Sequence, residues 1–356
     1  MTAPISTPQD AAVSSALARR IAVTVAALAL YYIGTLVPLP GIEPAALKSF
    51  AASTGGPFSL ELISIFALGA GPVLSGLILA EMLQLLVPSK RRRAMGRETS
   101  SAFNAGIVVA ALAFAVYQSS EMAGALERIS GFVHEPSSTF RLACFATLTG
   151  ATALLIVLAD MVTRHGLGSG IWLLLVAPAL MHAPSTAAAV LDLVRVGRAA
   201  PLDLAALIAY PVAATAGLVA FERANPGTAT SGAFVWPLVL ANAAVAFLLL
   251  AAFPFLAPEQ MQSAAQALSP GEPLRLVLIA LLVPAFAVWR PRSIAGAVPE
   301  AARIETPMTL AALLAGIAIA GEVIGDWTGW PSLLDGQTIV ILTSIALGIL
   351  ASGVLR

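Results

Sequence analysis

An apolar segment interrupted by glycine and proline near its start constrains this chain most strongly. It runs from Leu60 to Pro88, reads LELISIFALGAGPVLSGLILAEMLQLLVP, and leads into a cluster of positive charge. Gly69, Gly71 and Pro72 interrupt what would otherwise be a spanning helix, and Glu81 lies deep in its second part. Lipid tolerates irregular backbone only where protein or a water-filled cavity covers it, and a carboxyl group inside a membrane helix points to function. The segment therefore predicts a polytopic membrane protein with a pathway through its middle.

The composition agrees with a membrane protein. Hydrophobic residues make up 58% of the 356 residues and charged residues only 11%, a balance too apolar for a soluble chain of this length. A transmembrane helix needs about 20 mostly apolar residues. Ten stretches meet that condition, at about 17–37, 69–88, 100–123, 140–163, 169–190, 202–222, 233–256, 273–290, 306–325 and 335–355.

The distribution of arginine and lysine predicts the orientation. With the N-terminus inside, the inner face holds 13 of the 19 cationic residues and the outer face holds 6. This bias predicts that both termini are cytoplasmic, with residues 1–16 forming a short cytoplasmic tail. Arg195 and Arg198 do not fit this bias, because the predicted topology places both on the outer face. The net charge is zero, so no global field recruits nucleic acid.

The ten helices divide into two sets of five, which we expect at residues 17–190 and 202–356. Because five is odd, the second half must run inverted relative to the first. Each half has a break near the start of its second helix, at Pro72 and at Trp236-Pro237. Such matched breaks point to a central site. The fold class predicted is an all-α polytopic membrane protein of two inverted five-helix halves.

Several stretches resemble the SecY family, the channel subunit of the Sec protein translocon. They fall in family order and span residues 17 to about 355. They are YIGTLVPLPGI at 32–42, SIFALG at 64–69 followed by Pro72 and Ser75, Thr149-Gly150 with Asp160, Thr163 and GLGSG at 166–170, and VWRPR at 288–292. The resemblance implies a protein-conducting channel for secretory proteins that also releases membrane proteins sideways into the bacterial plasma membrane.

The resemblance also implies the positions of a pore ring and a lateral gate. A channel that passes polar chain without leaking ions can seal with apolar side chains. By motif position, the ring comprises Ala70, Leu74, Ile171, Leu175, Val239 and Ile341. The polar residues that match the gate are Glu81, Gln118 and Asn242. Family members usually carry an amide where this chain has Glu81, so a carboxylate there is a departure.

Other departures concern the segments outside the membrane. The outer segment at about 43–63 is shorter than in the family, so we expect a reduced plug, within residues 55–63 if one remains. The two inner loops that dock the ribosome and the motor ATPase SecA are abbreviated. They keep only Arg223, Arg290, Arg292 and Arg303, which leaves docking of SecA or the ribosome open. The resemblance implies a small SecE-like membrane subunit as a clamp, and signal sequences and nascent membrane segments as clients.

The same sequence features allow two functions other than a protein-conducting channel. A secondary transporter of a small solute also fits inverted halves with broken helices, and a non-conducting insertase or scaffold would keep the gate without the pore. No enzyme is expected, because Ser169 near His165 or His182 lacks an oxyanion-hole motif. The three histidines lack metal-ligand spacing, and no cofactor is expected. The single cysteine, Cys144, is expected to be a small buried hydrophobe.

Overall fold

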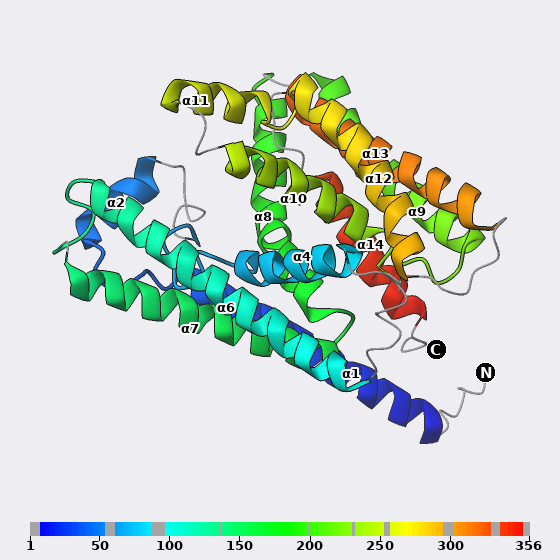
Figure 1. Ribbon diagram of the computed structural model, residues 1–356, viewed down its shortest axis with the longest axis horizontal. Coiled ribbons are helices and arrows are strands. Elements are labelled where there is room, and N and C mark those ends of the chain that lie inside the picture. Colours follow the sequence, from blue (N-terminus) through cyan, green and yellow to red (C-terminus); the bar gives the residue numbers. More distant parts are fainter. Residues whose placement is uncertain are drawn as a thin grey trace. The chain divides into compact units, whose positions relative to one another are not determined.

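The described structure is helical throughout. A computed structural model describes residues 8–53, 61–86, 97–135, 137–197, 200–229, 232–252, 257–294, 302–328 and 335–351. Within these residues lie twelve helices, which Figure 1 labels. They are α1 (Pro8–Thr35), α2 (Pro44–Ser53), α4 (Gly71–Leu86), α6 (Arg97–Arg128), α7 (Ser138–His165), α8 (Gly170–Arg195), α9 (Pro201–Ala224), α10 (Val235–Ala252), α11 (Pro258–Ala267), α12 (Pro273–Ile294), α13 (Ala302–Thr328) and α14 (Gly336–Ala351).

Each of the ten predicted stretches overlaps one helix, and α2 and α11 are additional. Six helices are long and apolar enough to cross a membrane, within α1, α6, α7, α8, α9 and α13. Four more are apolar but shorter, within α4, α10, α12 and α14. The chain is therefore an all-helical membrane protein.

The contacts divide the chain into two compact units. Among the described residues, the first unit contains 8–81 and 97–181, and the second contains 82–86 and 182–351. The division falls inside α8, between Met181 and His182. Each unit is described by itself below. The predicted halves at 17–190 and 202–356 remain a prediction.

Three long helices, α1, α6 and α7, form most of the first unit. α7 packs against both α1 and α6, and the hairpin of α6 and α7 is visible in Figure 1. α4 meets α6 at a close crossing, where a side chain on Gly76 would clash with the backbone of Ile107 and Ala111. Small residues let helix backbones approach closely in membranes, where no hydrophobic effect drives helices together.

The turn between α7 and α8 is held against α1 by hydroxyl groups. The Leu167 amide donates to Thr24 Oγ1 (2.9 Å), and the Gly170 amide donates to Thr163 Oγ1 (2.9 Å). These bonds satisfy backbone groups that the helix ends leave without helical partners. The glycine-rich sequence at 166–170 thus forms a tight turn between two helices.

The break in the second predicted span is an irregular segment, residues 61–70, whose backbone bonds inside the protein. It pairs with the chain after α1 through Leu39 N to Ile63 O and Ile65 N to Val37 O, both 2.9 Å. Gly69 has a φ of +52°, the left-handed conformation that glycine adopts without steric cost. α4 then begins at Gly71. The predicted interruption is therefore real, and it begins several residues before Gly69.

Side chains from α1 hold the same segment. Tyr31 stacks on Phe66 with ring centroids 5.5 Å apart, and the Tyr31 hydroxyl donates to Glu61 Oε1 (3.3 Å). Gly34 leaves room for the Phe66 ring, which a side chain there would overlap. The YIGTLVPLPGI motif thus shapes the end of α1 to receive the break.

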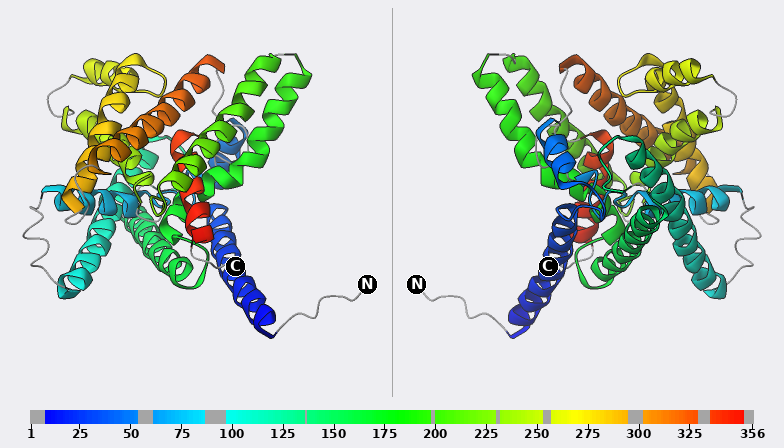
Figure 2. Two further views of the ribbon diagram at one scale, coloured as in Figure 1. Left: turned by 90° about the vertical axis from the view of Figure 1, so that its right-hand side faces the viewer. Right: turned by 90° about the vertical axis from the view of Figure 1, so that its left-hand side faces the viewer.

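The second unit is built from α9, α10, α12, α13 and α14. α12 and α13 run side by side (Figures 1 and 2), and α12 also packs closely on α10. The Tyr210 hydroxyl of α9 donates to the Ile317 carbonyl of α13 (2.8 Å). Gly321 and Gly336 face that hydroxyl, and a side chain on either would crowd it. These glycines allow α9, α13 and α14 to pack closely.

The α7–α8 turn generates a test of the close packing. We expect Gly170→Ala to lower the thermal unfolding midpoint in detergent, because the added methyl group would overlap the Ala159 carbonyl, and overpacking costs about 1–3 kcal/mol. Gly150→Ala is the matched control, since its methyl group meets nothing within 4 Å. Equal midpoints for the two variants would contradict the packing described.

Candidate functional site

The first unit contributes four predicted ring residues from two short stretches. Ala70 is buried (5% exposed) at the end of the irregular segment, and its carbonyl accepts from the Leu74 amide (2.9 Å) at the start of α4. Ile171 and Leu175 lie one turn apart at the start of α8. Leu74, Ile171 and Leu175 are half-buried. In each stretch, a spacing of four places the pair on one face.

The other two predicted ring residues lie in the second unit, on two helices that pack together. Val239 on α10 and Ile341 on α14 are almost completely buried, with 2% and 1% exposed. α10 and α14 pack together, joined by a hydrogen bond from Asn242 Nδ2 to Gln337 Oε1 (3.0 Å). Asn242 follows Val239 by three residues, and Ile341 follows Gln337 by four, so each ring residue lies one turn from this bond.

The predicted gate residues lie in both units. Glu81 on α4 is buried, with 7% exposed, and it lies five residues after the α4–α6 crossing at Gly76. Gln118 on α6 is half-buried. Burial of a carboxyl group in an apolar helix is costly, so the position of Glu81 is an informative departure from an amide. Asn242 belongs to the second unit.

Asn242 is the centre of a polar network in the second unit. Its Oδ1 accepts from Arg275 Nη2 of α12 (2.8 Å), and Arg275 Nε donates to Glu322 Oε1 of α13 (2.9 Å). Glu322 Oε2 accepts from the Gly271 amide (3.2 Å). The side chains of Arg275 and Glu322 are only 19% and 16% exposed. With the Gln337 bond, the network links α10, α12, α13 and α14.

Sequence analysis missed Arg275, Glu322 and Gln337 as partners of the gate residue. A signal was present, because opposite charges begin one apolar helix and nearly end the next, at the same predicted membrane surface. The side chain that would join them could not be identified without the fold.

The first part of the predicted plug segment is helix α2, which is attached to the loop after α6. Ile42 and Val133 form an antiparallel bridge, and Phe50 packs edge-on against Phe132 at 5.7 Å. Residues 54–60 lie outside the described residues, so the plug predicted within 55–63 is described only from Glu61 onward.

An exposed ion pair also joins the start of α2 to the loop after α6. His134 Nδ1 lies 2.9 Å from Glu43 Oε2. The hydrogen bond and charge of Glu43 raise the pKa of His134 above its ordinary value of 6.5, with a smaller contribution from Glu135. The contact is therefore fully present below about pH 6.5 and weakens as the pH rises through the raised pKa of His134.

The short loop after α9, which the charge distribution predicts to be cytoplasmic, is folded back on itself. Glu222 accepts hydrogen bonds from the amides of Gly227 (2.7 Å) and Ala229 (2.8 Å). Ser344 of α14 donates to the Ala229 carbonyl (3.2 Å). Arg223 is exposed at this surface. The loop is thus a fixed turn.

The other predicted docking cations lie at helix ends. Arg290 and Arg292 are in the last turns of α12, and Arg303 is at the start of α13. Their side chains lie outside the described part of the structure. In the residues searched, no group of three or more His, Cys, Asp or Glu side chains could hold a metal ion. Cys144 is completely buried within the first unit, which confirms its predicted role as a small apolar side chain.

These features define a class: a multi-pass helical membrane protein with an interrupted second helix, apolar ring candidates and buried polar groups beside them. A model of the SecY family matches residues 64–290, which include most of the break, α4, Asn242, Arg275 and the first three residues of the VWRPR motif. The chain belongs to the SecY family.

Curated relatives agree with this assignment. The SecY subunit of Aquifex aeolicus is 29% identical over 226 residues, covering 59% of this chain and 53% of that protein. SecY of Thermus thermophilus is 25% identical over 306 residues, covering 75% and 70%, and SecY of Escherichia coli K12 is 28% identical, covering 58% and 50%. The matches span about half the length of most of these relatives.

Solved structures show the same fold over the whole chain. The Sec61 channel in a canine ribosome–channel complex from the endoplasmic reticulum superposes with a TM-score of 0.63 at 14% identity, covering 100% of this chain and 94% of that one. A structure described as a protein conducting channel gives 0.64 at 15% identity with the same coverage. At these identities the likeness concerns the fold alone.

The polar network yields a stability prediction. We expect Glu322→Gln to lower the thermal midpoint clearly, because removing one partner of a buried ion pair costs about 3–5 kcal/mol. The double variant Arg275→Met/Glu322→Leu should recover much of the loss, since no buried charge remains. The control is Asp160→Asn, which removes an exposed pair with Arg164 worth less than about 1 kcal/mol.

The measurement is thermal unfolding of the three variants in one detergent. If Glu322→Gln unfolds at the same temperature as Asp160→Asn, the network does not stabilise the second unit.

Proposed function

We propose that this chain is the channel subunit of a protein translocon in the bacterial plasma membrane. Ten transmembrane helices form two inverted halves, with both termini cytoplasmic. The observation that carries the proposal is the family match over residues 64–290, because it covers the interrupted helix and most of the residues assigned to the ring and gate. A signal sequence or membrane segment enters from the cytoplasm, and no covalent chemistry is needed.

The closed pore is sealed by apolar side chains from both halves. Ala70, Leu74, Ile171 and Leu175 come from the first unit, and Val239 and Ile341 from the second. A constriction of this kind excludes ions by dewetting. A moving polypeptide parts the side chains, which then fit around it. Val239 and Ile341 are almost completely buried, which supports a rigid second wall, so opening depends more on the half-buried side chains of the first unit.

Lateral release uses the polar residues Glu81, Gln118 and Asn242. An apolar segment of the client leaves for lipid between the two halves, and a polar segment continues across. Asn242 is engaged by Arg275 and Gln337, which supports a gate wall that keeps its shape when the halves separate. Glu81 lies on the other wall, where the chain departs from the family's amide.

Partners supply the clamp and the energy. A SecE-like subunit holds the halves together. The inner loop after α9 is a fixed turn tied to α14, which supports weakened docking of the ribosome or SecA at Arg223, Arg290, Arg292 and Arg303. Proteins with long basic loops at this face can insert them into a partner, whereas this turn offers one exposed arginine.

Photo-crosslinking to a stalled secretory chain tests the function. Crosslinkers at Leu74 and at Glu81 should both capture the stalled chain, because the ring and the gate meet it on one path. The matched control is Val157 on α7, which is 62% exposed and should not capture it.

Other outcomes identify other functions. Crosslinks at Glu81 without crosslinks at Leu74 would indicate a non-conducting insertase. Crosslinks at neither position, together with loss of solute uptake in Glu81→Gln, would indicate a secondary transporter.

A further inference from the structure

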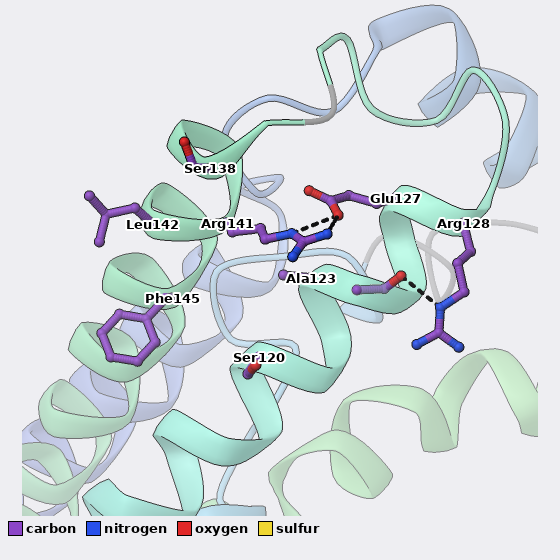
Figure 3. A pocket seen from close by; sticks show the side chains of 9 residues that line it. Ser120, Ala123, Glu127, Arg128, Ser138, Arg141, Leu142 and Phe145 are labelled. Atoms are coloured by element: carbon purple, nitrogen blue, oxygen red, sulfur yellow. Dashed lines mark hydrogen bonds and ion pairs between the residues drawn. The ribbon is translucent and has the colours of Figure 1, made fainter.

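A cavity lined by both charged and apolar side chains lies within the first unit, between the last turns of α6 and the first turns of α7 (Figure 3). Its volume is about 790 Å³. Three charged side chains line it, namely Glu127 and Arg128 at the end of α6 and Arg141 at the start of α7. The hydroxyls of Ser120 and Ser138 line it as well. None of these residues belongs to the ring or the gate.

Only one of the two carboxylate oxygens of Glu127 accepts a hydrogen bond from a described residue. Its Oε2 accepts from Arg141 Nε (2.8 Å) and from Arg141 Nη2. Its Oε1 is buried and has no hydrogen-bond partner among the described residues. The Glu127 side chain as a whole is only 10% exposed. Buried polar groups are nearly always hydrogen-bonded, so an orphaned carboxylate oxygen beside a cavity indicates a missing donor. A cationic donor satisfies a carboxylate best.

The other side of the cavity favours an anion. Arg128 also lines the cavity, and it donates its Nε to the Gly124 carbonyl (3.1 Å), a bond drawn in Figure 3 that does not use its terminal nitrogens. Ser137 caps the 28-residue helix α7, so Ser138 lies in its first turn, where backbone amides and the helix dipole attract negative charge. The lining therefore carries two positive groups and one negative group in a single cavity.

The depth of the cavity identifies the ligand class. It lies where two apolar spans end, Ala105–Arg128 and Ser138–His165, which is the level of lipid headgroups. Leu142 and Phe145 also line it, and Leu142 is 66% exposed one turn deeper along α7. A ligand with a phosphate, an ammonium group and apolar chains matches all three features.

We propose that this cavity binds the headgroup of phosphatidylethanolamine from the adjacent leaflet. The phosphate lies near Arg128, Ser138 and the start of α7, the ammonium group donates to Glu127 Oε1, and the acyl chains follow Leu142 and Phe145. Arg141 is 66% exposed, so its guanidinium can rotate to admit the ammonium group. This inference depends on the chain lying in a membrane and does not depend on channel activity.

The headgroup chemistry makes the proposal selective. Phosphatidylcholine has the same phosphate and chains, but its quaternary ammonium has no N–H to donate to Glu127 Oε1. Phosphatidylglycerol offers the phosphate without a cation, so it leaves that oxygen unsatisfied. Of these three headgroups, only ethanolamine provides the phosphate, the positive charge and the N–H donor.

Native mass spectrometry of the full chain, delipidated in detergent, tests the proposal with these three lipids of identical acyl chains. We expect phosphatidylethanolamine to bind at least about tenfold more tightly than phosphatidylcholine, the value of one charge-assisted hydrogen bond. Glu127→Gln should remove that preference. Arg128→Gln should weaken the binding of all three lipids about fivefold or more. Glu121→Gln, an exposed change on the same helix, should alter nothing.

Several results would overturn the proposal. They are equal binding of ethanolamine and choline lipids, tighter binding of phosphatidylglycerol, or a retained preference in Glu127→Gln. Competition by millimolar inorganic phosphate would show a free-anion site instead. If Glu127→Gln fails to fold, the double variant Glu127→Gln/Arg141→Gln removes the ion pair without leaving a lone charge, and Arg128→Gln leaves that pair untouched. Unchanged lipid binding in either variant also refutes the proposal.

Discussion

The structure depends on pairing buried polar groups with one another, because lipid offers no hydrogen bonds. The irregular segment at 61–70 meets this condition by pairing with residues 37–39. The second unit meets it with the Asn242–Arg275–Glu322 network. The interrupted helix and Asn242, which we propose to line the pathway, therefore also tie helices together. Function and stability are joined at the same positions.

The sequence predicted the helices well, because ten long apolar stretches and their glycine and proline punctuation are local signals. The break at Gly69 and the turn at 166–170 were visible for the same reason. Helix α2 was missed, since ten residues between prolines and glycines carry little periodicity. Its position depends on contacts with Val133, Phe132 and His134, which lie some ninety residues away in the chain.

The site was predicted only in part, for a physical reason. Motif position could name Asn242 as a gate residue, but its environment depends on Arg275 and Glu322, which reach it from other helices. The orphaned oxygen of Glu127 could not be predicted either, because it results from how one ion pair is oriented. Side-chain partners across helices are a property of packing, whereas apolar spans and breaks are a property of the chain itself.

The central claim is that a polypeptide passes the proposed ring residues, and single photo-crosslinkers in each unit test it most directly. We predict that a crosslinker at Ile171 in the first unit and one at Val239 in the second, introduced in separate variants, both capture a client chain arrested during translocation. Val157 on α7, which is 62% exposed, is the control position and should not capture it. Capture at neither ring position would contradict the proposed pore.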